Sequence, residues 1–161
     1  MGVSGCGKTT VGKLLSQNTG IPFIDADAFH PTENIQKMTS GIALTDIDRK
    51  PWLENLNQEL KQQSQKQGAI LACSALKEKY RNILSKDIKN VQWIFLKGDF
   101  KRIQERMKRR KNHFMDANLL QSQFDTLEKP KGAIEVNVSL SPAEIVTHIL
   151  KEISNKSQFG L

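Results

Sequence analysis

Residues 2–9 read GVSGCGKT and match the pattern G-x-x-x-x-G-K-[ST]. Glycines allow such a loop to curl, so that its backbone N–H groups point at the oxygens of a polyphosphate. In this pattern the lysine reaches the β- and γ-phosphates, the threonine hydroxyl is a ligand of Mg²⁺, and the following helix adds the positive end of its dipole. The sequence therefore predicts that ATP and Mg²⁺ bind here. The residues expected to contact the nucleotide are Gly2, Val3, Ser4, Gly5, Cys6, Gly7, Lys8, Thr9 and Thr10, with Thr9 also at the metal.

Two carboxylates, Asp25 and Asp27, follow the apolar run at residues 21–24. Ligands of open α/β sheets bind at the carboxyl ends of strands, and alternate side chains of an extended segment point the same way. We therefore expect both carboxylates on one side of the chain. We assign Asp25 to the Mg²⁺ site and Asp27 to orienting or deprotonating an acceptor hydroxyl, although the two roles could be exchanged. A simple loop or helix-cap feature is the alternative.

The basic residues are concentrated in one segment. The 161 residues include 24 Lys and Arg against 17 Asp and Glu, a formal net charge of +7. Residues 101–111 hold seven basic residues and one acidic residue, a net charge of +6. So local an excess is more typical of an anion clamp than of a nucleic-acid surface, and a solvated basic helix is the alternative. Arg106 and Arg110 lie four residues apart, on one face of a helix.

Apolar runs predict strands within residues 21–24, 69–73, 91–96 and 133–138, and helical patterns separate them. This order is typical of a parallel sheet covered by helices on both faces. Pro51 is expected in the first turn of a helix that ends at Gly68, and Ser141 to Glu144 predicts a capping box. The sequence contains no apolar run long enough for a membrane span. It contains two cysteines, Cys6 and Cys73. We therefore expect a reducing, cytoplasmic setting.

A phosphate-binding loop of this type normally follows a buried strand, yet Met1 alone precedes Gly2 in this sequence. Without that central strand, its neighbours lose hydrogen-bonding partners and the loop loses an anchor. We expect the true start to lie upstream, with Met1 at the end of a strand. The alternative is a chain that starts here and is compromised.

The whole set of motifs resembles the gluconate kinases, which are shikimate-kinase-like members of the P-loop kinases. The resemblance covers nearly the whole chain, and the combination of segments that carries it is specific. These segments are MGVSGCGKTT at residues 1–10, DADAFHP at 25–31, G-x-x-L-x-D-x-D-R-x-P-W-L at 41–53, CSALK at 73–77, and SQF at 122–124.

The resemblance implies a three-layer α/β P-loop kinase fold in one domain, with a parallel sheet, helices on both faces and a helical lid. The core would comprise residues 1–98 and 125–161, and the lid would span about residues 99–124. It also implies ATP-dependent phosphorylation of the 6-hydroxyl of D-gluconate. The lid would bring Arg110, and secondarily Arg106, to the nucleotide, where Arg110 would act with Lys8 and Asp27 in catalysis.

Gluconate is an anionic polyol, so its site needs a cation and hydrogen-bonding groups. Arg49 is the candidate clamp for the carboxylate, with a salt bridge to Asp46 or Asp48 as the alternative. His30 could bind a sugar hydroxyl or fix the turn before Pro31. Two further candidates for substrate contact, with surface solvation as the alternative, are Lys77 and Arg81.

Other functions remain open from the sequence. A kinase of shikimate or of nucleoside monophosphates is the first, and a non-catalytic ATP-binding or nucleic-acid-binding module is the second. A truncated, inactive protein is the third. The favoured interpretation predicts D-gluconate as a small-molecule partner, no nucleic acid and no membrane, and it allows for a homodimer.

Overall fold

The computed structural model describes residues 1–109 and 117–158, and seven α-helices, one 3₁₀ helix and four strands are assigned in these ranges. In chain order, these elements are α1 (Lys8–Thr19), β1 (Phe23–Asp25), η1 (Ala26–Phe29), α2 (Thr32–Thr39), α3 (Asp46–Ser64), β2 (Ile70–Ala72), α4 (Glu78–Ser85), β3 (Ile94–Lys97), α5 (Phe100–Arg109), α6 (Ala117–Thr126), β4 (Ile134–Asn137) and α7 (Pro142–Gln158).

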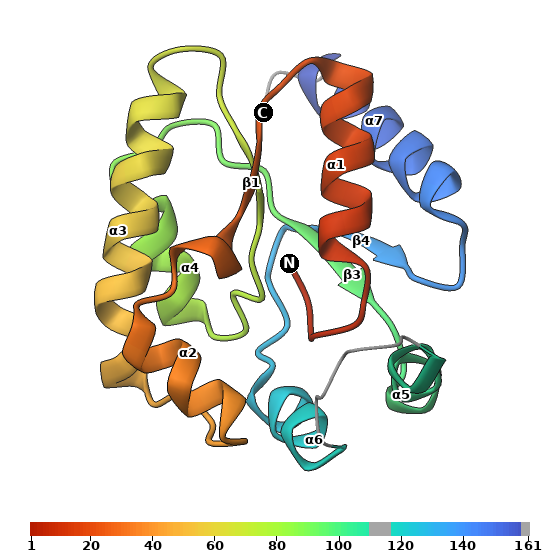
Figure 1. Cartoon of the computed structure of the whole chain (residues 1–161). Helices are drawn as coiled ribbons and strands as arrows, with labels where there is room; N and C mark the ends of the chain where they lie inside the picture. Colours follow the sequence, from red (N-terminus) through yellow and green to blue (C-terminus); the bar gives the residue numbers. More distant parts are fainter. Residues whose placement is uncertain (110–116, 159–161) are drawn as a thin grey trace.

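Helices cover the strands from two sides. Helices α1 and α7 contact each other on one side, and α3 and α4 contact each other on the other side (Figure 1). Each side has its own apolar core. The first core surrounds Ile103, Val138 and Ile149, and the second surrounds Leu53 and Leu56; all five side chains are fully buried. The predicted α/β class with helices on both faces is confirmed.

The strands form two parallel pairs instead of one continuous sheet. Strand β1 pairs with β2, and β3 pairs with β4. Met1 lies between the pairs: its amino group donates to the carbonyl oxygen of Ile94 at 2.6 Å, and its own carbonyl accepts from the Leu96 N–H at 3.0 Å. On the other side, the Gly2 N–H donates to the carbonyl of Ser74 at 3.2 Å. Met1 and Gly2 thus connect the two strand pairs through hydrogen bonds, and they hold the phosphate-binding loop against β3.

Local capping decides where two helices begin. The Thr45 side chain accepts from the Asp48 N–H, and the Asp48 carboxylate accepts from the Thr45 N–H, so α3 begins at Asp46. The prediction that Pro51 opens this helix is wrong, because this capping box precedes it and places Pro51 inside the helix. The predicted box of Ser141 and Glu144 is confirmed by both of its hydrogen bonds.

The predicted lid region contains α5 and α6, at the same end of the molecule as the start of α1 (Figure 1). These two helices contact each other, and the rings of Phe100 and Phe124 meet edge to face at 5.6 Å. Arg110 lies outside the described residues. None of the described helices is long and apolar enough to cross a membrane.

Candidate active site

The loop between Met1 and α1 has the backbone that its glycines predict. Gly7 has φ = 104° with open space where a Cβ would lie, so the backbone conformation alone favours glycine there. Gly5 has φ = 77°, and a Cβ would lie 2.7 Å from Cγ of Met107. Helix α5 therefore packs directly against the tip of the loop, a contact that requires glycine at position 5.

Lys8 folds back across this loop. Its Nζ donates to the carbonyl oxygens of Gly2 and Val3, both at 3.1 Å. The ammonium group thus lies inside the curl of the backbone, near the first turn of α1. This position is suited to a phosphate chain bound by the loop amides.

Asp25 connects the end of β1 to the first turn of α1. Its Oδ2 accepts from the Thr9 hydroxyl at 3.1 Å, and its Oδ1 accepts from the Asp27 N–H at 3.2 Å. Thr9 and Asp25 offer the hard oxygen ligands that Mg²⁺ prefers, and Mg²⁺ in such sites needs one or two protein ligands beside the phosphates. Within the described residues, no group of three or more His, Cys, Asp or Glu side chains could hold a metal. Thr9 and Asp25 therefore fit a Mg²⁺ ion that binds together with the phosphates of a nucleotide.

The sequence predicts that Asp25 and Asp27 share an extended segment, but in the structure they do not. The chain turns into η1 directly after Asp25, which caps that helix, so the expected alternation is wrong. The Asp27 side chain is 84% exposed and lies 4.0 Å from Nε2 of His30. It projects from the first turn of η1, where its carboxylate is open to a ligand.

His30 is buried beneath Asp27. Its ring stacks on Trp52 with centroids 4.1 Å apart, and the Trp52 indole donates to the carbonyl of Ala26 at 2.9 Å. Burial lowers the pKa of His30; Asp27 opposes this shift, and the charge of Arg49 adds to it. Of the two predicted roles, this placement favours fixing the turn, because the ring packs against α3.

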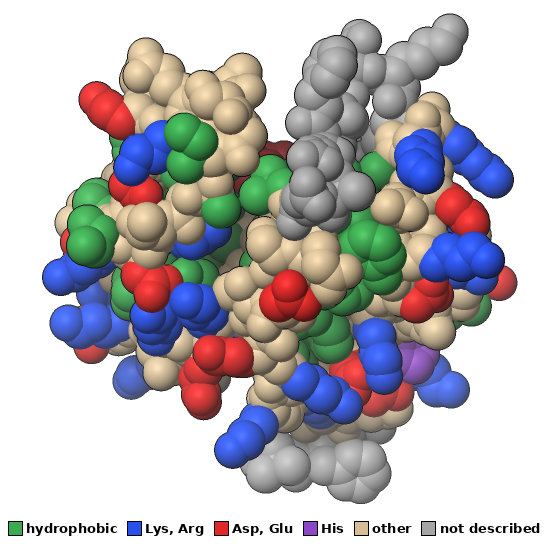
Figure 2. All heavy atoms as spheres, turned by 90° about the horizontal axis from the view of Figure 1, so that it is seen from below, with side chains coloured by type: hydrophobic (Ala, Val, Ile, Leu, Met, Phe, Trp, Pro, Cys, Tyr) green, Lys and Arg blue, Asp and Glu red, His purple; other side chains and the backbone are tan. Residues whose placement is uncertain are grey.

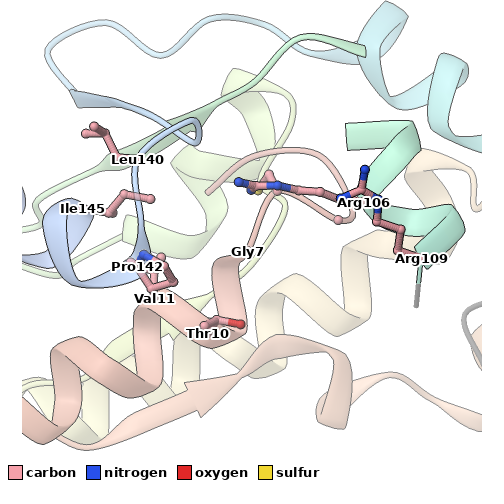
Figure 3. A pocket seen from close by; sticks show the side chains of 10 residues that line it. Gly7, Thr10, Val11, Arg106, Arg109, Leu140, Pro142 and Ile145 are labelled. Atoms are coloured by element: carbon pink, nitrogen blue, oxygen red, sulfur yellow. The ribbon is translucent and has the colours of Figure 1, made fainter. Parts of the chain in front are cut away.

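A cavity of about 280 Å³ opens beside the phosphate loop. Arg106 reaches toward the loop from α5, and the apolar side chains of Pro142 and Ile145 lie across the cavity from it (Figure 3). Nη2 of Arg106 donates to the carbonyl of Val138 at 2.6 Å, which holds the guanidinium at this wall. Arg109 also lines the cavity, a position that the pairing of Arg106 with Arg110 missed and that i, i+3 spacing could have suggested.

A second cavity, of about 320 Å³, lies between α3, the β2–α4 loop and α6. Its size falls at the lower end of the range for small-molecule sites. Two predicted substrate residues, Arg49 and Lys77, meet there. Sequence reasoning missed the other side of this cavity, which α6 provides through Leu119, Ser122, Gln123 and Thr126.

Asp46 lines this second cavity and forms ion pairs with two lysines. Its carboxylate pairs with Lys77 and Lys79 and accepts from the Tyr80 hydroxyl. Hydrogen bonds from Lys79, Tyr80 and Lys77 hold the pKa of Asp46 well below its usual range. Lys77 is therefore both paired and at the cavity, which departs from the solvated alternative.

Arg49 is not engaged by either aspartate proposed as its alternative partner. Asp46 pairs with the lysines, and Asp48 pairs with Lys37 at 2.7 Å, an interaction that keeps the pKa of Asp48 at about 2. Arg49 instead donates to the Leu44 carbonyl and lies 5.5 Å from the centre of the Tyr80 ring. Its guanidinium thus keeps donors for a ligand carboxylate.

Arg81 differs from both of its predicted roles. The residue is only 6% exposed, and its Nη1 donates to the carbonyls of Ala75, Leu76 and Glu128 at 3.0, 3.2 and 3.1 Å. It faces neither the cavity nor solvent, because these carbonyls surround it. Arg81 instead joins the β2–α4 loop to the segment after α6.

A phosphate-binding loop at the start of α1, parallel strands, and a second cavity beside it define a P-loop kinase. A family model described as "Shikimate kinase" matches residues 4–154. The thermosensitive gluconokinase of Escherichia coli is 46% identical over 133 residues, which cover 82% of this chain and 71% of that protein. The gluconokinase of Arabidopsis thaliana is 40% identical, over 96% of this chain and 90% of its own length. The chain belongs to the gluconokinase family, within the shikimate-kinase-like P-loop kinases.

Solved structures agree with this family. A gluconokinase from Sinorhizobium meliloti superimposes with a TM-score of 0.89 at 41% identity, over 98% of this chain and 91% of that one. A shikimate kinase from Aquifex aeolicus has a TM-score of 0.59 at 24% identity, over 99% and 97% of the two chains, and shares the fold.

Proposed function

We propose that this protein transfers the γ-phosphoryl group of ATP to the 6-hydroxyl of D-gluconate. The observation that carries the proposal is the pairing of a phosphate-binding loop with a second cavity that Arg49 and Lys77 line. Such cations suit the carboxylate of a sugar acid. The gluconokinases that are 38–46% identical support this choice of acceptor.

In the proposed reaction, the 6-hydroxyl oxygen forms a bond to the γ-phosphorus, and the bond from that phosphorus to the bridging oxygen breaks, releasing ADP. Lys8 and the loop amides hold the phosphates, and the hydroxyl proton passes to the carboxylate of Asp27. Mg²⁺ at Thr9 and Asp25 would neutralise phosphate charge. Arg106 would add a positive charge at the nucleotide cavity, and Arg110, outside the described residues, stays a prediction for the same role.

An ADP-release assay with a panel of acceptors tests this proposal. Gluconate should support turnover, whereas shikimate and nucleoside monophosphates should not. Shikimate is the competitor that matters, because it is also a carboxylate with hydroxyl groups and the matching family model carries its name. Faster turnover with shikimate would transfer the proposal to that acceptor, and inactivity with every acceptor would favour the truncated, inactive alternative.

The nucleic-acid alternative has its own test. In Figure 2, Lys and Arg side chains are interspersed with Asp and Glu on the face shown, without forming one continuous basic surface. We expect weak binding of duplex DNA or RNA that ATP does not change, and tight binding with a steep salt dependence would contradict this. The cytoplasmic location and the homodimer stay predictions.

A further inference from the structure

Gln123 of α6 contacts both sites. Its Oε1 accepts a hydrogen bond at 2.7 Å from the N–H of Ser4, which lies in the phosphate-binding loop 119 residues away in the sequence. The same side chain lines the second cavity, together with Arg49 and Lys77. Gln123 is therefore a direct polar link between the phosphate-binding loop and the cavity proposed for the acceptor.

The hydrogen bond divides the loop into two parts. In the first part, Gln123 takes the Ser4 N–H, and Lys8 takes the carbonyls of Gly2 and Val3. The second part lines the nucleotide cavity with Gly5, Cys6, Gly7 and Thr10. The first part of the loop is thus tied to the protein, and the second part faces the cavity.

Packing fixes the position from which Gln123 reaches the loop. Leu120, one turn earlier on α6, is 1% exposed and belongs to the same core as Val3. Phe124, the next residue after Gln123, packs against Phe100 of α5. Apolar contacts on both sides of Gln123 therefore hold α6 in place, and the amide has little freedom to turn away.

The hydrogen-bonding chemistry of the Gln123 amide shows which of its two polar atoms faces Ser4. A backbone N–H can only donate, so the atom that faces Ser4 must be the oxygen, and the NH₂ group carries two unused donors. Within the described part of the chain, no group accepts a hydrogen bond from this NH₂. The donors are available to an oxygen-rich ligand in the second cavity.

We propose that Gln123 is a positioning residue that couples the two sites. Its oxygen orients the loop through Ser4, and its NH₂ donates to a hydroxyl or carboxylate oxygen of the acceptor. A bound acceptor then fixes the amide, and through it the loop, so acceptor and nucleotide strengthen each other's binding. By linkage, this effect is reciprocal. The inference rests on the proposed function for the identity of the acceptor.

Binding of Mg·ADP with and without saturating gluconate tests the coupling, because these two ligands together cannot react. In the unmodified protein we expect gluconate to tighten ADP binding at least about fivefold, the low end of ordinary coupling between sites. Gln123→Met, which loses both the oxygen and the NH₂, should reduce this factor to less than about twofold. The matched control is Gln121→Met on the same helix, since Gln121 is exposed and donates to Asp125. This control should keep the full factor.

A second variant guards against loss of the fold. Gln123→Glu keeps an oxygen for the Ser4 N–H and removes both donors, so it should keep the unfolding midpoint and still lose the coupling. The inference is wrong if the unmodified protein shows no coupling, or if Gln123→Met and Gln123→Glu keep the factor of the Gln121→Met control. A purely structural role would lower the unfolding midpoint of Gln123→Met and leave the coupling intact.

The acceptor panel separates this inference from the proposed function. If gluconate supports no turnover, the proposed function fails, and the coupling is measured with whichever acceptor does support turnover. If no acceptor does, both fail together. Turnover with gluconate alongside unchanged coupling in the Gln123 variants overturns the inference alone.

Discussion

Arg81 provides the sharpest test of how the second cavity is built. Sequence reasoning placed it at the substrate, whereas the structure surrounds its guanidinium with the carbonyls of Ala75, Leu76 and Glu128. Replacing it with methionine keeps the aliphatic stem and removes the donors. The β2–α4 loop, which carries Lys77, would then lose one of its connections to the segment after α6, and the hydrogen bond from the Glu128 N–H to the Leu76 carbonyl would remain.

The expected cost follows from these contacts. One nitrogen donates to all three carbonyls, so two N–H groups are shared among them. A hydrogen bond with a charged donor contributes about 1.5–3 kcal/mol. The Leu76 carbonyl would keep the N–H of Glu128 as a donor, whereas the carbonyls of Ala75 and Glu128 would lose the Arg81 donor. We expect Arg81→Met to lower the free energy of unfolding by about 3 kcal/mol. In a domain of this size, that corresponds to a fall of roughly 6–12 °C in the unfolding midpoint.

Arg49→Met is the matched counterpart, because Arg49 lines the cavity and lies in the same pair of packed helices. Losing a charge-assisted contact to the acceptor carboxylate should raise the KM for gluconate at least about tenfold. Its unfolding midpoint should fall by less than half as much as that of Arg81→Met. For Arg81→Met at about 20 °C, where the folded form dominates, the KM should change by less than about threefold.

Thermal unfolding and steady-state kinetics of Arg81→Met and Arg49→Met show which arginine supports the fold and which binds the acceptor. The reasoning is refuted by the reverse pattern, in which Arg81→Met raises KM strongly at an unchanged midpoint. Equal effects of the two variants on KM would also remove the distinction between a supporting arginine and a ligand-binding one.

Three further predictions concern the loop, the acceptor hydroxyl and the chain start. Lys8→Ala should reduce turnover at least about 100-fold in the ADP-release assay, because it removes a positive charge held at the phosphates; near-normal turnover would reject that role. Asp27→Asn should lower kcat about 100-fold and leave the Kd for ATP within about twofold, and a loss confined to ATP binding would move Asp27 to the metal. In protein produced with Met1 as its first residue, burial lowers the pKa of the Met1 amino group to about 6 from the ordinary 8.0. The unfolded chain therefore holds this proton up to a higher pH than the folded chain, so stability should rise between about pH 6 and pH 8, by about 2–3 kcal/mol. Urea unfolding across this pH range measures the rise in stability. The rise should shrink when about six residues are added before Met1, because they convert the amine to an amide and extend β-type pairing beside β3. If stability rose equally with pH in the extended protein, Met1 would be excluded as the source.

Several features could be predicted because their causes are local in the chain. Residues 2–10 contain the glycines and the lysine of the loop, and this pattern predicted that a helix follows the glycines; α1 begins at Lys8, directly after Gly7. The four apolar runs predicted four strands, and each prediction overlaps an observed strand. The Ser141 capping box depends on two residues three apart, so it also could be predicted.

Other features depend on contacts between distant segments. Asp27 lies in a 3₁₀ helix and not in the extended segment of Asp25, because Asp25 caps that helix. Arg81 is buried because three carbonyls from two segments converge on it. Spacing puts Arg109 near Arg106 on α5, but only the folded chain shows that both line the cavity beside the phosphate-binding loop.

The sequence alone thus determined the chemical groups of this protein, namely a phosphate-binding loop and carboxylates after a strand. Its motifs were also sufficient to predict a sugar-acid kinase. The tertiary structure alone decided which cations line a cavity and which, like Arg81, connect buried segments of the scaffold. It also placed Gln123 between the two sites. The physical reason is that the preferences of a loop or a cap are set by neighbouring residues, whereas burial and hydrogen-bond satisfaction of a side chain depend on segments that meet only when the chain is folded.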